Sequence, residues 1–425
     1  MKTFISAIQW MAFMIAGAIA APIAIADLFQ LDPQETAAFV QRTIFVLGVA
    51  SLLQGTLGHR LPIHEGPAGL WWGVFAIYAS FVGTLYVSET ETLRALSGGM
   101  IVSGICFFAL TFFGFMEKLA KLFTPTITFI YLMLLILQLS ASFLKGMLGI
   151  TADTPVLQPL VAILSITVVA IAFYLGQHRV SWVRQFSIMF SLVIGWLIFS
   201  IFGKAPAVVT SDKWLIFPEI LAFGTPLFDA GTIVTSLFIT LLLTTNMIAS
   251  IRVLEAIVNN GASIDTLRYK RGGFISGISQ ITGGMFASIG SVPISGAAGF
   301  VSQTGMKTIK PFAVGSLLVV IISLFPPLMN VMAAIPAPVG YAVTFVIFTK
   351  MVGMALREIE HSSNRERTYS TAGLALLVGV GAMFLPPEAT LQLPTVVASL
   401  LNNGLVLGTV IAIITEQYLI RKEAR

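Results

Sequence analysis

Long apolar runs recur along the whole chain and constrain its fold more than any other feature. They lie between clusters of charged residues or of Gly and Pro, and they are about 17 to 25 residues long, the length that a helix needs to cross a bilayer. Apolar residues make up 56% of the chain and charged residues only 10%. In lipid each segment must satisfy its own backbone hydrogen bonds, so the spans should be helices. The sequence therefore predicts an all-α integral membrane protein.

Fourteen apolar runs can be read along the chain, in two groups of seven, and all except 295–306 and 394–420 have about this length. The first half, residues 1–205, has runs at 4–25, 37–57, 67–86, 93–115, 122–144, 157–176 and 184–203. The second half, residues 206–425, has runs at 229–251, 273–290, 295–306, 311–331, 335–356, 369–386 and 394–420. Because seven is odd, the second half would enter the membrane from the opposite side. This 7+7 inverted repeat is the plan of many secondary transporters.

The distribution of basic residues predicts the orientation of these spans. All but six of the 24 Lys and Arg residues fall on one side of the membrane in this arrangement. The six exceptions are Arg42, Arg94, Lys145, Lys204 and Lys213 on the other side, and Lys350 within a span. By the positive-inside rule, both termini are expected in the cytoplasm. Topology then explains the net charge of +5, and no nucleic-acid partner is expected.

The third span of each half contains a Gly-x-Ala-Gly string, at 66–69 and at 296–299. Glycine permits extended backbone and the close approach of a ligand. An extended stretch leaves peptide groups unpaired at membrane depth, which is tolerated where they line an enclosed cavity or pair with each other. The helices that follow, from Leu70 and Phe300, would aim their positive N-terminal ends at that cavity. The alternative is close helix packing through small residues.

Four strings resemble motifs of the nucleobase–ascorbate transporters, also called nucleobase:cation symporters, and the resemblance covers nearly the whole chain. Residues 9–13 are similar to the family's opening motif, with Trp10 in place of histidine. Residues 223–229 resemble the lead into the eighth span, 268–273 the start of the ninth, and 335–340 the start of the twelfth. The last string is the most specific of the four.

The resemblance implies a fourteen-span fold with two short strands before helices 3 and 10. The core domain would comprise 1–116 and 229–331, and the gate domain 117–205 and 335–420. The protein would be a permease of the cell membrane that carries purines such as xanthine or uric acid, or uracil, by rocking of the core against the gate. It would use a coupling proton or sodium ion and no cofactor or metal, and its oligomeric state could be a homodimer.

The resemblance also implies where the substrate binds. A planar base would lie between the eighth span and the two strands, with its edge against amide groups and its faces against apolar side chains. The residues expected to contact it are Asn246, Thr245, Ala68, Gly69, Ser295, Gly296, Ala297 and Gln9. A helix-to-helix hydrogen bond is an equal alternative for Asn246.

Two positions depart from the family pattern. The carboxylate usual in the middle of the eighth span falls on Asn246, and the acidic or amide position after the tenth-span strand falls near Gly296. Asparagine does not titrate, so neither position can carry a proton. The alternative is therefore an uncoupled nucleobase facilitator.

Several other residues near the spans have predicted positions or roles. Asp229 is expected to cap the eighth span, Glu416 to lie at the membrane interface, and Glu255 to lie close to Arg252. The pair His64 and Glu65 is either solvated in a loop or a proton relay on the cytoplasmic side. Trp71 and Trp72 could stack on the substrate, but tryptophan at the edge of a span more often belongs to the interfacial belt. Lys350 would either form an ion pair across the gate or extend to the surface.

Two other classes of function compete with nucleobase transport. An anion transporter on the same fold would bind its substrate between two facing helix N-termini and would need no carboxylate. A membrane-embedded enzyme would need a cluster of reactive side chains at helical spacing. The four histidines, at 59, 64, 178 and 361, all fall in predicted loops, which argues against an enzyme.

Overall fold

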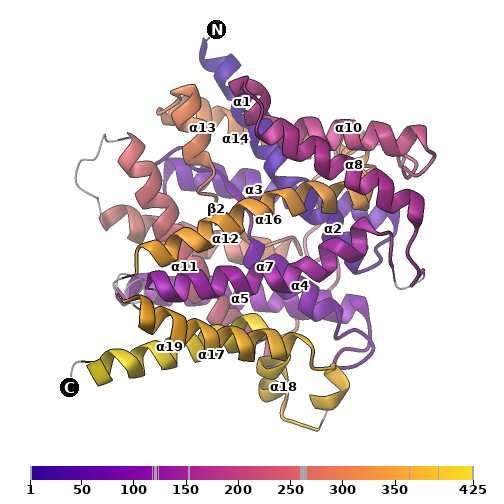
Figure 1. Ribbon diagram of the computed structural model, residues 1–425. Helices are drawn as coiled ribbons and strands as arrows, with labels where there is room; N and C mark the ends of the chain where they lie inside the picture. The colour runs from indigo at the N-terminus through magenta and orange to yellow at the C-terminus, as the bar shows by residue number, and fades with distance from the viewer. Residues whose placement is uncertain are drawn as a thin grey trace.

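The structure is a computed structural model. It describes residues 2–116, 118, 122, 124–151, 154–258, 266–362, 364–390 and 392–423. Helices make up most of the described chain, and many of them run side by side across the view of Figure 1.

The first half of the chain contains one short strand among its helices. The elements are α1 (Lys2–Ala18), α2 (Ala20–Leu28), α3 (Pro33–Thr56), β1 (Glu65–Pro67), α4 (Gly69–Ala79), α5 (Glu89–Phe112), α7 (Pro125–Met147), α8 (Pro159–Gly176), α9 (Ser181–Gln185) and α10 (Ser187–Ile201). Side chains cap several of these helices: Asp32 accepts hydrogen bonds from the amides of Gln34 and Glu35, both at 2.8 Å, at the start of α3. Such caps satisfy amides that a first helical turn leaves free.

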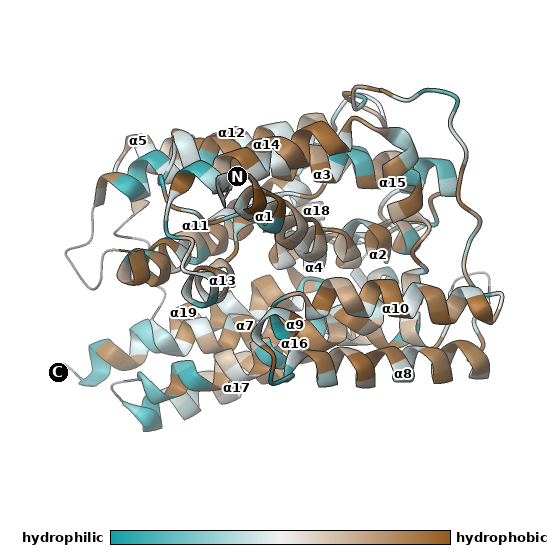
Figure 2. Ribbon diagram, turned by 90° about the horizontal axis from the view of Figure 1, so that it is seen from above, coloured by the Kyte–Doolittle hydropathy of each residue, from teal (hydrophilic) through white to brown (hydrophobic). Residues whose placement is uncertain are grey.

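The second half also contains one short strand among its helices. Its elements are α11 (Ala230–Val258), α12 (Thr266–Met285), β2 (Ser291–Pro293), α13 (Ala297–Thr304), α14 (Ile309–Ser323), α15 (Pro326–Ala333), α16 (Ala337–Glu360), α17 (Arg365–Met383), the 3₁₀ turn η1 (Pro387–Thr390), α18 (Thr395–Leu401) and α19 (Gly404–Glu423). Figure 2 shows that α8 and α10 are hydrophobic along nearly their whole length, whereas hydrophilic residues gather at the ends of α17 and α19 nearest the C-terminus. This distribution is typical of helices surrounded by lipid.

Eight spans of the described chain are long and apolar enough to cross a membrane. One is formed by α1 and α2 together, and the others are α3, α5, α7, α8, α11, α16 and α19. The pair α14 and α15 would add a ninth, although it is bent by 89°. The bend falls just before Pro326 and Pro327, which cannot donate the amide hydrogen bonds of a continuous helix. The structure therefore shows a multi-pass helical architecture, while the count of fourteen spans stays a prediction.

Two predicted spans end early. The predicted run 67–86 contains only the 11-residue α4, after which the chain turns through Gly83 at φ 76°. The predicted run 295–306 contains only the eight-residue α13. Both helices are too short to cross a bilayer, which takes about 20 residues. Each is preceded by a three-residue strand, β1 before α4 and β2 before α13.

The last predicted span, 394–420, is two helices. Asn402 and Asn403 separate α18 from α19, and the side-chain oxygen of Asn403 accepts a hydrogen bond from the amide of Val406 at 3.0 Å. Asparagine at this position caps the new helix instead of continuing the old one.

The helices pack in two groups. In the first group α5 lies against α12 and α11, while α14 lies against α1 and α3. In the second group α16 lies against α7 and α8, and α17 and α19 pack together beside α7. Contacts between the groups are fewer and involve mainly α2 with α16, α4 with α7, and α11 with α18.

The two halves are joined by an antiparallel pair of three-residue strands. Glu65 lies opposite Pro293, Gly66 opposite Val292, and Pro67 opposite Ser291. The presence of strands before α4 and α13 agrees with the expectation, but the predicted position of the second one is wrong. Gly296 has the helical angles φ −57° and ψ −22° and caps α13, so the second Gly-x-Ala-Gly string begins a helix. The extended residues lie just upstream, where β-branched Val292 favours a strand.

Candidate functional site

Helix α11 brings Asn246 next to the second strand. Ser250, one turn further along, donates a hydrogen bond to the Pro293 carbonyl at 2.9 Å, and its hydroxyl lies 3.4 Å from Oδ1 of Asn246. Asn246 is half-buried, and among the described residues none accepts a hydrogen bond from its Nδ2. Thr245 donates within its own helix, to the carbonyl of Leu241 at 3.1 Å. Asn246 therefore has a free amide donor beside the strand pair, and Thr245 does not.

The two helices that follow the strands present free backbone amides. Ala68 caps α4, and its own amide donates to the Gly290 carbonyl at 2.9 Å, but the amides of Gly69 and Leu70 have no acceptor among the described residues. At the start of α13 the amides of Ser295 and Gly296 are likewise without an acceptor there. The α4 amides belong to a first helical turn and carry the partial positive charge of a helix N-terminus. Ser295 and Gly296 instead precede α13, whose own first amides are paired.

The remaining predicted site residues differ in accessibility. Gly296 is exposed and Ser295 is half-buried, so both are open to a ligand. Ala68 and Ala297 are fully buried at 0% exposure, so their side chains pack inside the protein. Gln9 is half-buried in α1, one helical turn before Phe13 and therefore on the same face. The structure thus brings α1, α4, α11 and α13 to the strand pair.

Aromatic side chains that the sequence analysis did not assign to the substrate site lie at the same place. Phe13 of α1 stacks on Phe300 of α13 with a ring-centre distance of 4.3 Å, and Trp10 contacts Phe300 at 4.4 Å. Phe13 also meets the His64 ring edge-on at 5.0 Å. These residues come from segments far apart in sequence, and only their helical or loop positions could be read beforehand. They provide the apolar faces that a planar ligand would need.

Gly69 lies close to the second packing group. A Cβ atom at Gly69 would lie 3.7 Å from Cδ2 of Leu135 in α7 and 3.8 Å from Cζ of Phe348 in α16. The N-terminus of α4 therefore faces the boundary between the two groups of helices.

The pair His64 and Glu65 is not solvated, which corrects the simpler of the two predictions. His64 is 3% and Glu65 2% exposed. Both carboxyl oxygens of Glu65 and Nδ1 of His64 are without a hydrogen-bond partner among the described residues. The sequence places the pair in a loop, but the loop folds inward because Glu65 is part of β1.

Other acidic residues have structural partners. Asp229 accepts hydrogen bonds from the amides of Gly231 at 2.8 Å and Thr232 at 3.0 Å, as expected of a helix cap. Glu416 was expected at the interface, but it is fully buried and accepts a hydrogen bond from the Thr124 hydroxyl at 2.6 Å. Its buried position follows from the packing of α19 against α7.

Glu255 was expected to lie close to Arg252, and the structure shows that it forms an ion pair with Arg268 at 3.0 Å. Arg268 also donates to the carbonyl of His59 at 2.6 Å. His59 lies outside the spans and is fully buried, and its Nδ1 accepts the amide of Leu61 at 3.1 Å. Burial, and to a lesser extent the nearby charge of Arg268, lowers the pKa of His59 to about 3, so this ring is neutral.

The predicted interfacial position of Trp71 and Trp72 is wrong, because both are buried, at 1% and 4% exposure. Trp71 donates to the side-chain oxygen of Gln280 at 2.8 Å, and Gln280 in turn donates to the Ser291 carbonyl at 2.7 Å. Trp71 thus supports the strand pair from behind. Lys350 is exposed, in agreement with the reading that it extends to the surface.

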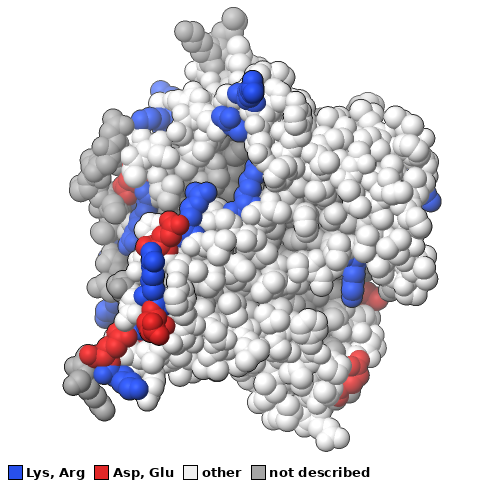
Figure 3. All heavy atoms as spheres, in the orientation of Figure 1, with Lys and Arg blue, Asp and Glu red and all other residues white. Residues whose placement is uncertain are grey.

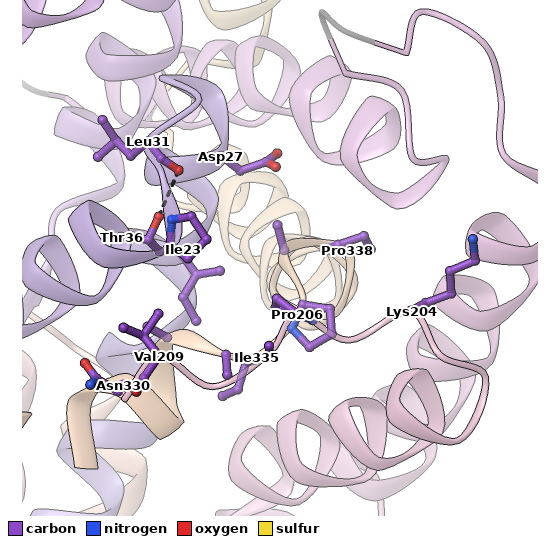
Figure 4. A pocket seen from close by; sticks show the side chains of 16 residues that line it. Ile23, Asp27, Leu31, Thr36, Lys204, Pro206, Val209, Asn330, Ile335 and Pro338 are labelled. Atoms are coloured by element: carbon purple, nitrogen blue, oxygen red, sulfur yellow. Dashed lines mark hydrogen bonds between the residues drawn. The ribbon is translucent and has the colours of Figure 1, made fainter. Parts of the chain in front are cut away.

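A cavity of about 280 Å³ lies away from the strand pair, where α2 and α3 approach the start of α16 (Figure 4). Asp27, Thr36, Lys204, Asn330 and Pro338 are among its lining residues. The lining includes most of the 335–340 string but none of the predicted site residues. At its edge the Tyr341 hydroxyl donates to the Ala24 carbonyl at 2.9 Å and to the Asp27 carboxylate at 3.0 Å.

Comparison with known sequences places these features in context. A family model described as "Permease family" matches residues 1–388. The chain is 45% identical over 422 residues to the Bacillus subtilis protein named "Putative purine permease YwdJ", covering 98% of this chain and 96% of that one. It is 23% identical to the uric acid permease PucJ and 24% identical to the xanthine permease of the same organism, with 97% of this chain and at least 91% of each relative covered.

Comparison with solved structures identifies the fold. The transmembrane domain of the cyanobacterial bicarbonate transporter BicA matches with a TM-score of 0.64 at 12% identity, over 98% of this chain and 97% of that one. The murine anion transporter Slc26a9 in its inward-facing state matches with a TM-score of 0.63 at 13% identity, over 99% of this chain and 68% of that one. At this level of identity the likeness concerns the fold alone.

Proposed function

The chain belongs to the nucleobase–ascorbate transporter family, the xanthine and uracil permeases, and from this membership we propose that it carries purine bases such as xanthine or uric acid across the cell membrane. Membership of a permease family also means that the chain is a transporter and not an enzyme. The observation that supports the substrate most directly is the free amide of Asn246 beside the strand pair.

The chemistry of the site suits a purine base. The carbonyl oxygens at the edge of such a base accept hydrogen bonds, which the free amides at the starts of α4 and α13 can donate, while most of its ring nitrogens are N–H donors. Asn246 offers both a donor and an acceptor, which matches the alternation around an oxidised purine. Phe13 and Phe300 offer apolar surface for stacking.

Alternating access would use the two packing groups as core and gate. The proposed core comprises 1–116 and 229–331, and the proposed gate 117–205 and 335–420. Support comes from the sparse contacts between the groups and from Gly69, which faces Leu135 and Phe348 across the boundary. In this scheme the halves 1–205 and 206–425 are inverted repeats, which the antiparallel pairing of β1 with β2 supports.

Orientation follows from the basic residues. Lys and Arg in Figure 3 gather toward the side of the molecule on which the C-terminus lies. We take this side as cytoplasmic, with both termini on it. Lys2 supports this orientation by its sequence position alone, because its side chain lies outside the described residues, as do Lys121 and Arg425.

The proposed coupling is symport with a cation, most simply a proton. The test is uptake of labelled xanthine, uric acid, uracil and guanine into cells that express the protein, with and without a protonophore. We expect saturable uptake of at least one purine that falls when the proton gradient collapses. Uptake that persists unchanged would instead identify an uncoupled facilitator.

An inorganic anion is the second candidate substrate, because the solved structures with this fold include anion transporters. Labelled bicarbonate and sulfate belong in the same experiment. Saturable transport of either anion, without uptake of any base, would contradict the nucleobase proposal.

A further inference from the structure

Glu65 is a buried titratable residue whose carboxyl group has no assigned role in the fold or in the proposed binding site. Its amide donates to the Ser51 hydroxyl at 2.8 Å, which anchors β1 to α3. Its carboxyl group, in contrast, has no charged partner among the described residues, and the one polar side chain that interacts with it is the Ser291 hydroxyl. The buried carboxylates Glu255 and Glu416 have the partners Arg268 and Thr124, and the half-buried Asp27 has Tyr341.

The described neighbours of the Glu65 side chain carry no positive charge. Strand β1 packs against α3, α1 and β2. From α3 the neighbour is Ser51, and from β2 it is Ser291, whose uncharged hydroxyl lies on the same face of the strand pair as the carboxyl group. From α1, the contacts of this segment are Phe13 and Gly17, which lie beside His64. His64 is the adjacent titratable residue, and no Lys or Arg side chain among the described residues is recorded against the Glu65 carboxyl.

An ionised carboxylate in such a place would lack both water and a counter-charge. Burial of an unpaired charge is strongly unfavourable, and within a membrane protein the group becomes neutral instead. Glu65 therefore holds a proton in the conformation seen here. It can release that proton once a rearrangement brings water to the strand pair.

Glu65 is also connected to the proposed substrate site. It lies opposite Pro293 in the strand register, and the Pro293 carbonyl accepts the hydrogen bond of Ser250, which lies beside Asn246. On its own strand, the residues three and four positions later are Ala68 and Gly69. A base bound at Asn246 and the α4 N-terminus thus touches both strands that enclose the carboxyl group.

We propose that Glu65 carries the coupling proton in place of the carboxylates that Asn246 and Gly296 do not supply. A proton from the outer solution binds one carboxyl oxygen while the base binds. After the core moves, the same O–H bond breaks, and the proton leaves to cytoplasmic water together with the base. One proton and one base move per cycle, so no other reactant is needed. This inference rests on the proposed nucleobase transport.

The test uses the full chain in proteoliposomes, with the membrane potential clamped and an inward proton gradient of about one pH unit, which supports about tenfold accumulation of base at one-to-one coupling. The labelled base is the one that wild type carries best. For Glu65→Gln we expect accumulation to be lost, while exchange of labelled for unlabelled base continues. The matched control is Glu416→Gln, which removes a buried carboxylate elsewhere and should still accumulate the base.

Outcomes separate this inference from the proposed function. Accumulation by Glu65→Gln equal to that of wild type would overturn the role of Glu65 and leave nucleobase transport standing. An inactive wild type would overturn both. If Glu65→Gln also loses exchange, a pH indicator in unbuffered detergent solution gives the answer, with the base at a concentration shown to saturate each variant: the base should change the number of bound protons in wild type and in Glu416→Gln, but not in Glu65→Gln. An equal change in all three would contradict the proposal.

Discussion

Trp71 and Trp72 are adjacent in sequence, and both are buried, but their indole N–H groups have different surroundings. Trp71 donates to Gln280, which holds the carbonyl of Ser291 in β2. Trp72 packs against Phe143 and Phe348, and its N–H has no partner among the described residues. Only Trp71 therefore connects α4 to the strand pair by a hydrogen bond.

We expect Trp71→Phe to lower the stability of the protein more than Trp72→Phe. Both changes remove similar volume, but only the first leaves the Gln280 oxygen buried and unpaired, at a cost of about 1 to 3 kcal/mol. Thermal unfolding in detergent, measured for both variants, checks this difference. Equal losses would mean that the Trp71 hydrogen bond contributes little.

Asn246→Ala should abolish uptake of the base or raise its KM by about tenfold or more, because the loss of two hydrogen bonds to a substrate is worth about 1.4 kcal/mol or more. Expression and thermal stability should stay near those of wild type. Asn402→Ala is the matched control: it removes a buried amide that donates to Thr390 at 2.6 Å, far from the strands. A normal KM in Asn246→Ala would remove Asn246 from the site.

Sequence reasoning singled out Asn246 as a candidate, and the structure places it beside β2, but the same reasoning misjudged the burial of His64, Glu65 and Trp71. The count to Asn246 runs along one helix, so a local pattern sufficed. The burial of the other three depends on a strand partner in the opposite half of the chain. Charge and size alone favour an exposed position for such residues, and no local pattern reports a contact of this kind.

At the scale of elements, the strand pair depends on a close approach at Gly290, just before β2. A Cβ atom there would overlap the Trp71 ring and approach the Gln280 oxygen. Gly283 lies inside α12, and a Cβ atom there would have its nearest neighbours at 3.7 Å or more, which is ordinary contact. The first glycine is required by space, and the second is not.

Gly290→Ala should therefore destabilise the protein by about 1 to 3 kcal/mol, as overpacking does, and weaken binding of the base. Gly283→Ala should be neutral or stabilising by up to about 1 kcal/mol, because alanine favours a helix interior. Unfolding temperature and base affinity, measured for both, provide the check. A Gly290→Ala protein as stable as wild type would show that β2 can shift without cost.

The existence of most long helices could be predicted, whereas the ends of the broken ones could not. Apolar length alone identifies α3, α5, α7 and α16, since a bilayer imposes it. The short α4 and α13 end where tertiary contacts replace the continuous helix. The second strand lies upstream of its glycine string because the register with β1, and not the glycines, sets the extended residues.

At the scale of the whole molecule, the contact between α2 and α16 closes one end of the boundary between the two groups of helices. Tyr341 of α16 donates to Ala24 and Asp27 of α2 beside the cavity of Figure 4. By the orientation proposed above, this end faces the outside. The hydrogen bonds therefore favour a conformation that is closed to the exterior.

Tyr341→Phe should shift the protein toward outward opening. One hydroxyl contributes about 0.5 to 1.5 kcal/mol, so we expect roughly a threefold to tenfold faster reaction of Ile335→Cys, which lines the cavity and is 7% exposed, with an impermeant maleimide. The single native thiol, Cys106, is first replaced by alanine. Tyr174→Phe, which alters an exposed hydroxyl, is the control. Unchanged labelling in Tyr341→Phe would exclude a closing role for this contact.

The pairing of β1 with β2 also has a consequence for biosynthesis. The ribosome releases β1 long before β2, and the intervening helices must enter the membrane while Glu65 and the edge of β1 have no partner. Contacts between distant segments form late, because the chain between them must be ordered first. The binding site can therefore be completed only after most of the polypeptide has been inserted. A nascent chain that stops before β2 would expose an acidic, unpaired edge inside the bilayer, which is a feature that quality-control proteases of the membrane could recognise.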